Sequence, residues 1–156
     1  MFGLFRSAAI VDPVLGDLRR ARGRWRGKLT LAGTVIPISL AGSRVAPNDA
    51  ALSEARSLPS KFETFRPAIE AALFEHDEPY ADAVSTGELP KFSGAPIESP
   101  NDVWANVSLE FVSIEPMDGV LTTEIAYGTQ WDDEHLLGAR FQSGTLVELC
   151  GSTVPS

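Results

Sequence analysis

The chain has 156 residues, of which 44% are hydrophobic and 22% charged, a composition that excludes a disordered or fibrous protein and fits a single domain over residues 1–156. Thirteen Lys and Arg against 21 Asp and Glu give a net charge of −8, which argues against a protein that follows nucleic acid over its whole surface. The acidity is uneven. Residues 1–44 hold eight basic and two acidic side chains, a charge of +6, so the remainder carries −14. Such a division indicates either a binding surface or a fold that pairs its charges internally.

The sequence favours a reducing, cytoplasmic location. Cys150 is the single cysteine, so no intramolecular disulfide can form. Arg6 interrupts the short apolar start of the chain, which does not fit a signal peptide. No apolar run approaches the roughly 18 residues of a membrane-spanning helix, and no membrane contact is expected.

The first predicted elements are strands. Residues 12–18 contain Pro and Gly and predict a turn before a strand. Residues 25–31 and 35–40 then predict a β-hairpin that turns at Ala32-Gly33. Because Pro37 cannot donate a ladder hydrogen bond, the second strand is expected to be an edge strand, or to pair there only through its acceptor side.

A comb of basic residues occupies every even position before this hairpin turn: Arg20, Arg22, Arg24, Arg26 and Lys28. In an extended segment these side chains share one face, and Trp25 lies on the other. Two interpretations are open. A basic stripe could bind phosphate, with Trp25 available for stacking. The favoured interpretation is internal pairing with acidic residues of neighbouring strands, so nucleic-acid binding is not expected. These acidic residues are Glu110, Glu124 and Glu148.

The middle of the chain predicts helices. Asn48 is a suitable N-cap for a helix over residues 48–58, which Pro59 would end. A capping-box pattern that starts at Ser60 predicts a second helix, which Pro67 would kink or restart. One apolar stripe at three- and four-residue steps is expected to be buried: Phe62, Phe65, Ile69, Ala72 and Leu73.

The last third of the chain returns to strands. Residues 88–101 contain three prolines and predict an irregular loop, which is a candidate functional loop. Strands are predicted over residues 107–111 and 121–127, and a last hairpin over residues 138–149. The elements are connected by hairpins rather than βαβ crossovers. The order predicts an α+β fold in which N-terminal and C-terminal hairpins form a largely antiparallel sheet, with about two helices from the middle packed on one face.

Both histidines lie among acidic residues, in the segments Glu75–Glu78 and Trp131–His135. Imidazole and carboxylate groups can hold a divalent metal or act as a general base, but no diagnostic ligand spacing accompanies them. Structural roles in turns and packing fit these segments as well. A metal-dependent hydrolase is therefore kept as the alternative function. Its side chains would be His76, His135, Asp132 and Glu134.

Three short patterns stand out in the sequence. They are Asp12-Pro13-Val14-Leu15-Gly16 with Leu18, Trp25-Arg26-Gly27, and Trp131-Asp132-Asp133-Glu134-His135 followed by Leu137, Gly138 and Phe141. The patterns resemble recurring elements of a family of small, uncharacterised bacterial proteins, a domain of unknown function. The resemblance implies a bacterial α+β domain of unassigned activity, similar to small acidic proteins that act as immunity or accessory factors. It identifies no catalytic residue.

We therefore expect a non-enzymatic protein-binding domain of immunity or accessory type that needs no cofactor and occludes a basic partner protein. The missing dinucleotide, phosphate-loop and nucleophile-elbow motifs agree with this expectation. Trp104 and Trp131 are predicted as aromatic anchors within an acidic rim formed with Asp132, Glu134 and His135. The sequence leaves the oligomeric state open.

Overall fold

A computed structural model of the chain describes residues 9–152, which form an eight-stranded sheet, one long α-helix and a short 3₁₀ helix. The strands are β1 (Ala9–Asp12), β2 (Gly16–Ala21), β3 (Arg24–Leu31), β4 (Thr34–Leu40), β5 (Val107–Met117), β6 (Val120–Thr129), β7 (Leu137–Gln142) and β8 (Thr145–Gly151). The helix α1 spans Asp49–Ser85 and the 3₁₀ helix η2 spans Pro100–Asn106. The predicted α+β class is confirmed.

The strands lie in the sheet in their chain order, as two antiparallel groups of four. The groups meet where Ile38–Leu40 of β4 pair in parallel with Val112–Ile114 of β5. This one parallel pair is connected through α1, so the expectation of hairpins alone was wrong at this point. β4 lies inside the sheet and is not the predicted edge strand. Pro37 is accommodated because pairing with β5 begins only at the next residue.

Two-residue turns connect four of the hairpins, and each has positive φ at both positions: Arg22-Gly23, Ala32-Gly33, Asp118-Gly119 and Ser143-Gly144. Such turns follow the right-handed twist of the strands that they join. The first of them divides the predicted basic comb. Arg20 lies on β2 directly opposite Trp25, and therefore on the helix-covered face, whereas Arg24, Arg26 and Lys28 lie on the other face of β3.

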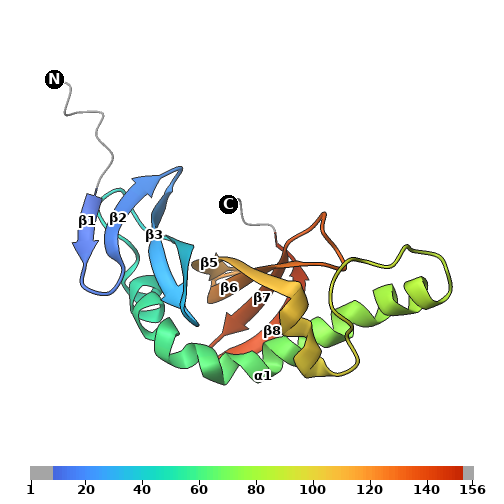
Figure 1. Cartoon of the computed structure of the whole chain (residues 1–156). Coiled ribbons are helices and arrows are strands. Elements are labelled where there is room, and N and C mark those ends of the chain that lie inside the picture. The colour runs from blue at the N-terminus through green and yellow to red at the C-terminus, as the bar shows by residue number, and fades with distance from the viewer. Residues whose placement is uncertain (1–8, 153–156) are drawn as a thin grey trace.

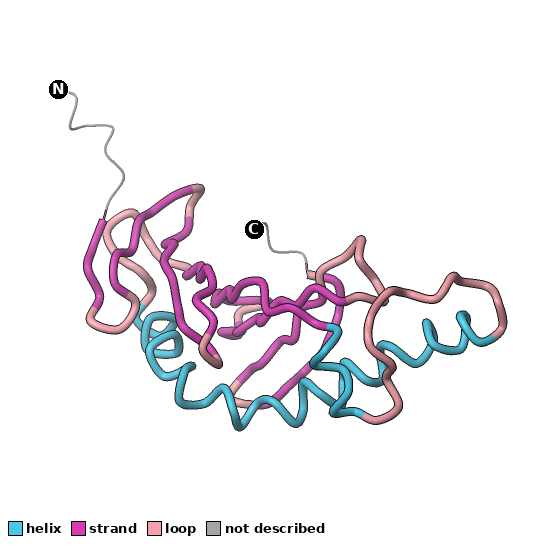
Figure 2. Tube along the Cα trace, in the orientation of Figure 1, coloured by secondary structure: helices cyan, strands magenta, loops and turns pink. Residues whose placement is uncertain are grey.

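One continuous helix replaces the two predicted helices. Asn48 caps it as expected, with its side-chain oxygen accepting a hydrogen bond from the Ala51 amide. Pro59 and Pro67 lie within the helix on its exposed side, and Figure 2 shows that α1 changes direction along its course. The predicted capping box is wrong, because the Ser60 hydroxyl donates to the Ser57 carbonyl in mid-helix.

The core lies between α1 and one face of the sheet (Figure 1). Phe62, Phe65, Ile69 and Leu73 of the predicted stripe are buried, and the Phe65 ring stacks on Phe141 of β7 with the ring centroids 4.2 Å apart. Ala72 is only partly buried. A bulge between Leu109 and Phe111 shifts the register of β5. Phe111 therefore leaves the main core and packs with Ala126 on the opposite face.

The most apolar helical stretch falls short of what a bilayer crossing requires in the part of the chain that the structure describes.

Candidate binding site

The sheet has one face that α1 does not cover, which we call the open face (Figure 1). A row of polar side chains crosses it from β2 to β8, because each is directly opposite the next in the strand register. The row comprises Arg19, Arg26, Ser39, Ser113, Glu124, Arg140 and Glu148. Directly opposite residues point to the same side of a sheet, so these groups are neighbours in space.

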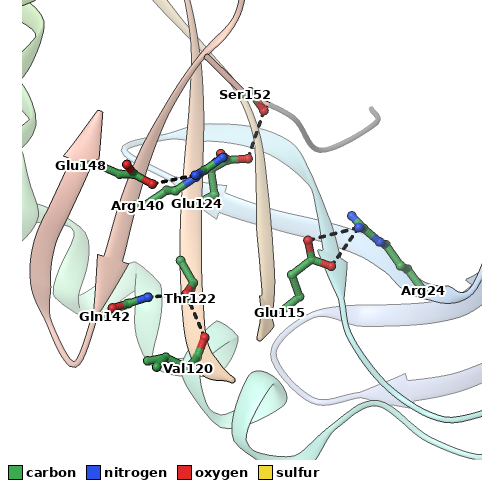
Figure 3. Close-up of polar contacts among 9 residues, drawn as sticks. All are labelled: Arg24, Glu115, Val120, Thr122, Glu124, Arg140, Gln142, Glu148 and Ser152. Carbon is green, nitrogen blue, oxygen red and sulfur yellow. Dashed lines mark hydrogen bonds and ion pairs between the residues drawn. The ribbon is translucent and has the colours of Figure 1, made fainter. Parts of the chain in front are cut away.

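In the C-terminal half of the row the charges are satisfied within the protein (Figure 3). Glu124 is 0% exposed, and its two carboxylate oxygens accept hydrogen bonds from Arg140 Nε and Ser152 Oγ, each at 3.0 Å. Arg140 also donates to Glu148, at 2.7 Å. These bonds satisfy a buried charge that would otherwise destabilise the fold.

In the N-terminal half most of the basic side chains on the open face lack an ion-pair partner among the residues described. Arg24 forms an ion pair of 2.8 Å with Glu115, which is the contact in Figure 3 that joins the two halves. Among residues 9–152, no carboxylate forms an ion pair with Arg19, Arg26 or Lys28. Internal pairing of the comb is therefore seen for Arg24, but its partner is Glu115 and not the predicted Glu110, Glu124 or Glu148, of which the last two pair with Arg140 instead.

Two adjoining hollows open on this side of the molecule, and Glu110 and Leu136 lie between them because they line both. The acidic hollow has a volume of about 250 Å³ and includes Asp132, Asp133 and His135 of the predicted acidic segment. Neither Lys nor Arg is present among the described residues that line it. Its three carboxylates, including Glu110, favour a cationic group.

The second hollow, which we call the central groove, has a volume of about 410 Å³ and lies over β3, β4 and β5. Phe111, Pro37 and Leu136 give it apolar walls, and Arg26, Ser39 and Glu110 give it three polar groups. No local pattern in the sequence indicates this groove. The alternation pattern places Phe111 with the core residues of β5, and only the bulge after Leu109 turns the ring to the open face.

Asp132 fixes the acidic segment against the end of α1. Its carboxylate accepts hydrogen bonds from the Tyr80 hydroxyl and His135 Nδ1, both at 3.1 Å. Burial raises the pKa of Asp132, but the hydrogen bonds from His135 and Tyr80 outweigh that effect and lower it. Asp132 is therefore held as an anion at the wall of the acidic hollow.

Trp131 is a core residue rather than the predicted surface anchor. Its side chain is 6% exposed, and its indole Nε1 donates to His76 Nδ1 at 3.0 Å. The bond requires an unprotonated Nδ1 on His76, and burial lowers the pKa of this imidazole in agreement with that requirement. Glu134 and His135 are exposed, so the acidic segment has a buried start and an open end.

Trp104 is partly buried and packs against the core. Its Nε1 donates to Glu70 on α1 at 2.8 Å, and the Arg66 guanidinium lies 4.6 Å from the ring centroid. The ring also meets Tyr127 of β6 edge-on. These contacts fasten η2 to the helix and the sheet, and the role of the partly exposed Trp104 as a binding anchor stays a prediction.

Exposed carboxylates lie in the acidic segment itself and along the last turns of α1, which the bond from Tyr80 to Asp132 joins to that segment and which project beyond the sheet in Figure 1. We call this region the acidic end. Its exposed members are Glu75, Glu78, Asp82, Glu88, Asp133 and Glu134. Residues 70–88 and 131–135 contain no Lys or Arg, so no basic side chain of these two segments offsets their charge.

The residues of the alternative hydrolase do not form a ligand cluster. Within residues 9–152, no group of three or more His, Cys, Asp or Glu side chains is placed to hold a metal ion. His76 is engaged by Trp131, and His135 by Asp132. Cys150 lies opposite Gly138 on the open face, half-buried, and burial raises the pKa of its thiol. The geometry adds no support to the hydrolase hypothesis.

Comparison with known proteins identifies a family and no function. The sequence pattern of a family described as a domain of unknown function, DUF6985, matches residues 14–153. No curated protein matches the chain, and no solved structure matches it either.

Proposed function

We propose, for a chain that belongs to the DUF6985 family of domains of unknown function, that it is a non-enzymatic protein-binding domain whose acidic end covers a basic surface of a partner protein. The observation that carries this proposal is the acidic hollow. Three carboxylates line it, and further exposed acidic residues lie on the α1 end that Tyr80 joins to Asp132. A single Arg or Lys side chain of a partner would fit the hollow, and the surrounding carboxylates would attract the rest of a basic surface.

The internal contacts of the acidic end support a binding role. Tyr80 and His76 on α1 fix the start of the Trp131–His135 segment, so the exposed carboxylates that follow are held on a rigid support. A rigid surface loses little conformational entropy on association. Action by occlusion, of immunity or accessory type, would require only this surface and no cofactor. The single cysteine, partly buried, agrees with a reducing cytoplasm as the place of action.

Neutralisation of the acidic end tests the proposal. The tagged protein and a triple variant, Glu78→Gln, Asp82→Asn and Asp133→Asn, would each be expressed in the native host and captured at low salt. A matched triple variant, Asp17→Asn, Glu63→Gln and Asp118→Asn, changes the net charge equally at sites outside the acidic end.

We expect a basic protein to be retained stoichiometrically by the native chain and by the matched variant. The acidic-end variant should lose it, with affinity at least about tenfold weaker when the purified pair is measured, because several interface charges contribute together. Two results would overturn the proposal. One is equal loss of the partner from both triple variants, and the other is the absence of any stoichiometric partner at low salt.

A further inference from the structure

We propose that the central groove is a binding site for a small apolar monocarboxylate, held by its carboxylate at Arg26 and Ser39 and by its apolar body against Phe111. Nothing in the family description assigns such a site. The inference concerns the open face alone and does not depend on the acidic end.

Arg26 supplies an unused positive charge at the groove. The only hydrogen bond of its guanidinium within residues 9–152 runs from Nε to the Ala21 carbonyl, at 3.4 Å. A guanidinium has five N–H donors in a planar fork that matches the two oxygens of a carboxylate. Arg26 is partly buried, so water screens it less than it screens a free surface arginine.

Ser39 supplies a second donor beside this charge. The residue is 7% exposed, and its hydroxyl oxygen is buried without a hydrogen-bond partner. A buried hydroxyl without a partner is unfavourable, and such a group calls for a specific explanation. Ser39 is directly opposite Arg26 in the register of β3 and β4, so both donors lie on the open face as neighbours. One carboxylate could accept hydrogen bonds from both of them.

The rest of the groove selects an apolar body. Phe111 and Pro37 line it, and so does the exposed Leu136 from the loop between β6 and β7. The volume of about 410 Å³ falls in the range of small-molecule sites, and an apolar lining with a few placed polar groups is typical of them. Binding of a single-stranded nucleic acid would need an open aromatic face for base stacking, and Phe111 is too buried to offer one.

Glu110 limits the ligand to one negative charge. It lines the same groove, and its carboxylate accepts a hydrogen bond from the Ser108 hydroxyl at 2.7 Å. A second carboxylate at the end of the ligand away from Arg26 would meet this anion and be repelled. The arrangement therefore favours a monocarboxylate over a dicarboxylate.

The probe for this site is 3-phenylpropionate, titrated into the full-length ¹⁵N-labelled protein and followed by amide chemical shifts. We expect saturable shifts centred on Ser39 and Phe111. Arg26→Gln should weaken binding by at least about tenfold, since a hydrogen bond to a charged group contributes on that order. Ser39→Ala should weaken it less, and Leu136→Ser should weaken it without unfolding the protein, because Leu136 is exposed.

Controls separate a built site from general attraction to a basic surface. Lys28→Gln removes the same charge from the same face of β3, but Lys28 does not line the groove, so affinity should be unchanged. The neutral amide 3-phenylpropanamide should bind at least about tenfold more weakly than the acid. The acidic-end triple variant should bind the probe as the native chain does, which distinguishes this inference from the proposed partner surface.

Several results would overturn the inference. They are the absence of saturable shifts up to the solubility limit of the probe, equal binding of acid and amide, and equal losses for Lys28→Gln and Arg26→Gln. If a ten-residue oligothymidylate bound with shifts over Arg19, Arg26 and Lys28 and displaced the probe, the open face would instead be a nucleic-acid surface.

Discussion

The two halves of the open face differ in whether their charged side chains are paired. On β6, β7 and β8 the acidic and basic side chains alternate across the register and bond one another, as Glu124, Arg140 and Glu148 show. On β2 and β3 two cations, Arg19 and Arg26, are directly opposite each other. Opposite charges in cross-strand pairs stabilise a sheet and like charges destabilise it. The charges of the C-terminal half therefore stabilise the fold. The two cations of the N-terminal half lower its stability, as charged groups in binding sites commonly do.

The backbone of the C-terminal half is shaped around its buried charge. A Cβ atom at Gly138 would lie 2.5 Å from the Glu124 carboxyl carbon, closer than real contacts allow. Glycine at this position thus makes room for Glu124 between β6 and β7. In the N-terminal half, Arg26 faces the central groove, with no carboxylate paired to it among the residues described. The contrast fits a structural role for the charges of the C-terminal half and the proposed binding role for Arg26 in the N-terminal half.

Removal of Arg140 should give the largest effect. Arg140→Ala leaves the Glu124 carboxylate buried without its main partner, and such losses destabilise proteins by about 3–5 kcal/mol. We expect a fall of about 3 kcal/mol in the free energy of unfolding, measured by urea denaturation at neutral pH.

Glu148→Gln serves as the control, because Glu148 is half-exposed and its pair with Arg140 resembles a surface ion pair. Its effect should stay below about 1 kcal/mol. Similar changes in the free energy of unfolding for the two variants would mean that the buried pair stabilises the fold no more than a surface ion pair does. The C-terminal half would then not differ from the N-terminal half in its use of charge.

The contact between His76 and Trp131 should give an intermediate, pH-dependent effect. Burial lowers the pKa of His76 from its ordinary 6.5, an effect that the nearby Asp132 partly offsets. In the unfolded chain His76 takes up a proton near pH 6.5, whereas in the folded protein it does so only at lower pH. The unfolded state thus binds more protons in this range, and stability should fall as the pH drops below 6.5, by up to about 1.4 kcal/mol per pH unit.

His76→Asn isolates this contribution, since an Asn oxygen can accept the Trp131 indole hydrogen bond and does not titrate. Asp77 acts in the opposite direction, because burial and the charge of Glu78 raise its pKa and favour its protonated form in the folded state. The difference in stability between the native chain and His76→Asn between pH 7 and 5 removes that background. Parallel pH profiles for the two proteins would contradict the assignment.

Hairpins and helix faces were predictable because local chemistry determines them. The Ala32-Gly33 turn, the Asn48 cap and the stripe through Phe65 all act within a few residues, whereas the Arg22-Gly23 turn was missed because the alternation of basic residues continues through it. Prolines misled the prediction of helix ends. Pro59 removes one hydrogen bond, but burial of Leu58 and Phe62 on both sides of it outweighs that loss.

The candidate site was predicted only in part. The acidic segment was found because its charges are adjacent in sequence, although its Trp131 is buried and does not serve as an anchor. The central groove depends on a bulge in β5 and on the parallel contact of Ser39 with Ser113. Those residues are far apart in the chain, and no local pattern relates them.

Neutralisation of the unpaired cations on β2 and β3 should give the smallest change in stability. It is also the most direct test of the difference between the two halves of the open face. Arg19 lies directly opposite Arg26, so Arg19→Gln relieves like-charge repulsion and should raise the free energy of unfolding by about 0.2–0.5 kcal/mol at low salt. The gain should disappear at about 1 M salt, where screening acts within about 3 Å. Urea denaturation at both salt concentrations measures it, with Lys28→Gln on the same sheet face as the control. A loss of more than about 1 kcal/mol on Arg19→Gln would show that these cations stabilise the fold, because exposed positions without a structural role usually stay within about 0.5 kcal/mol.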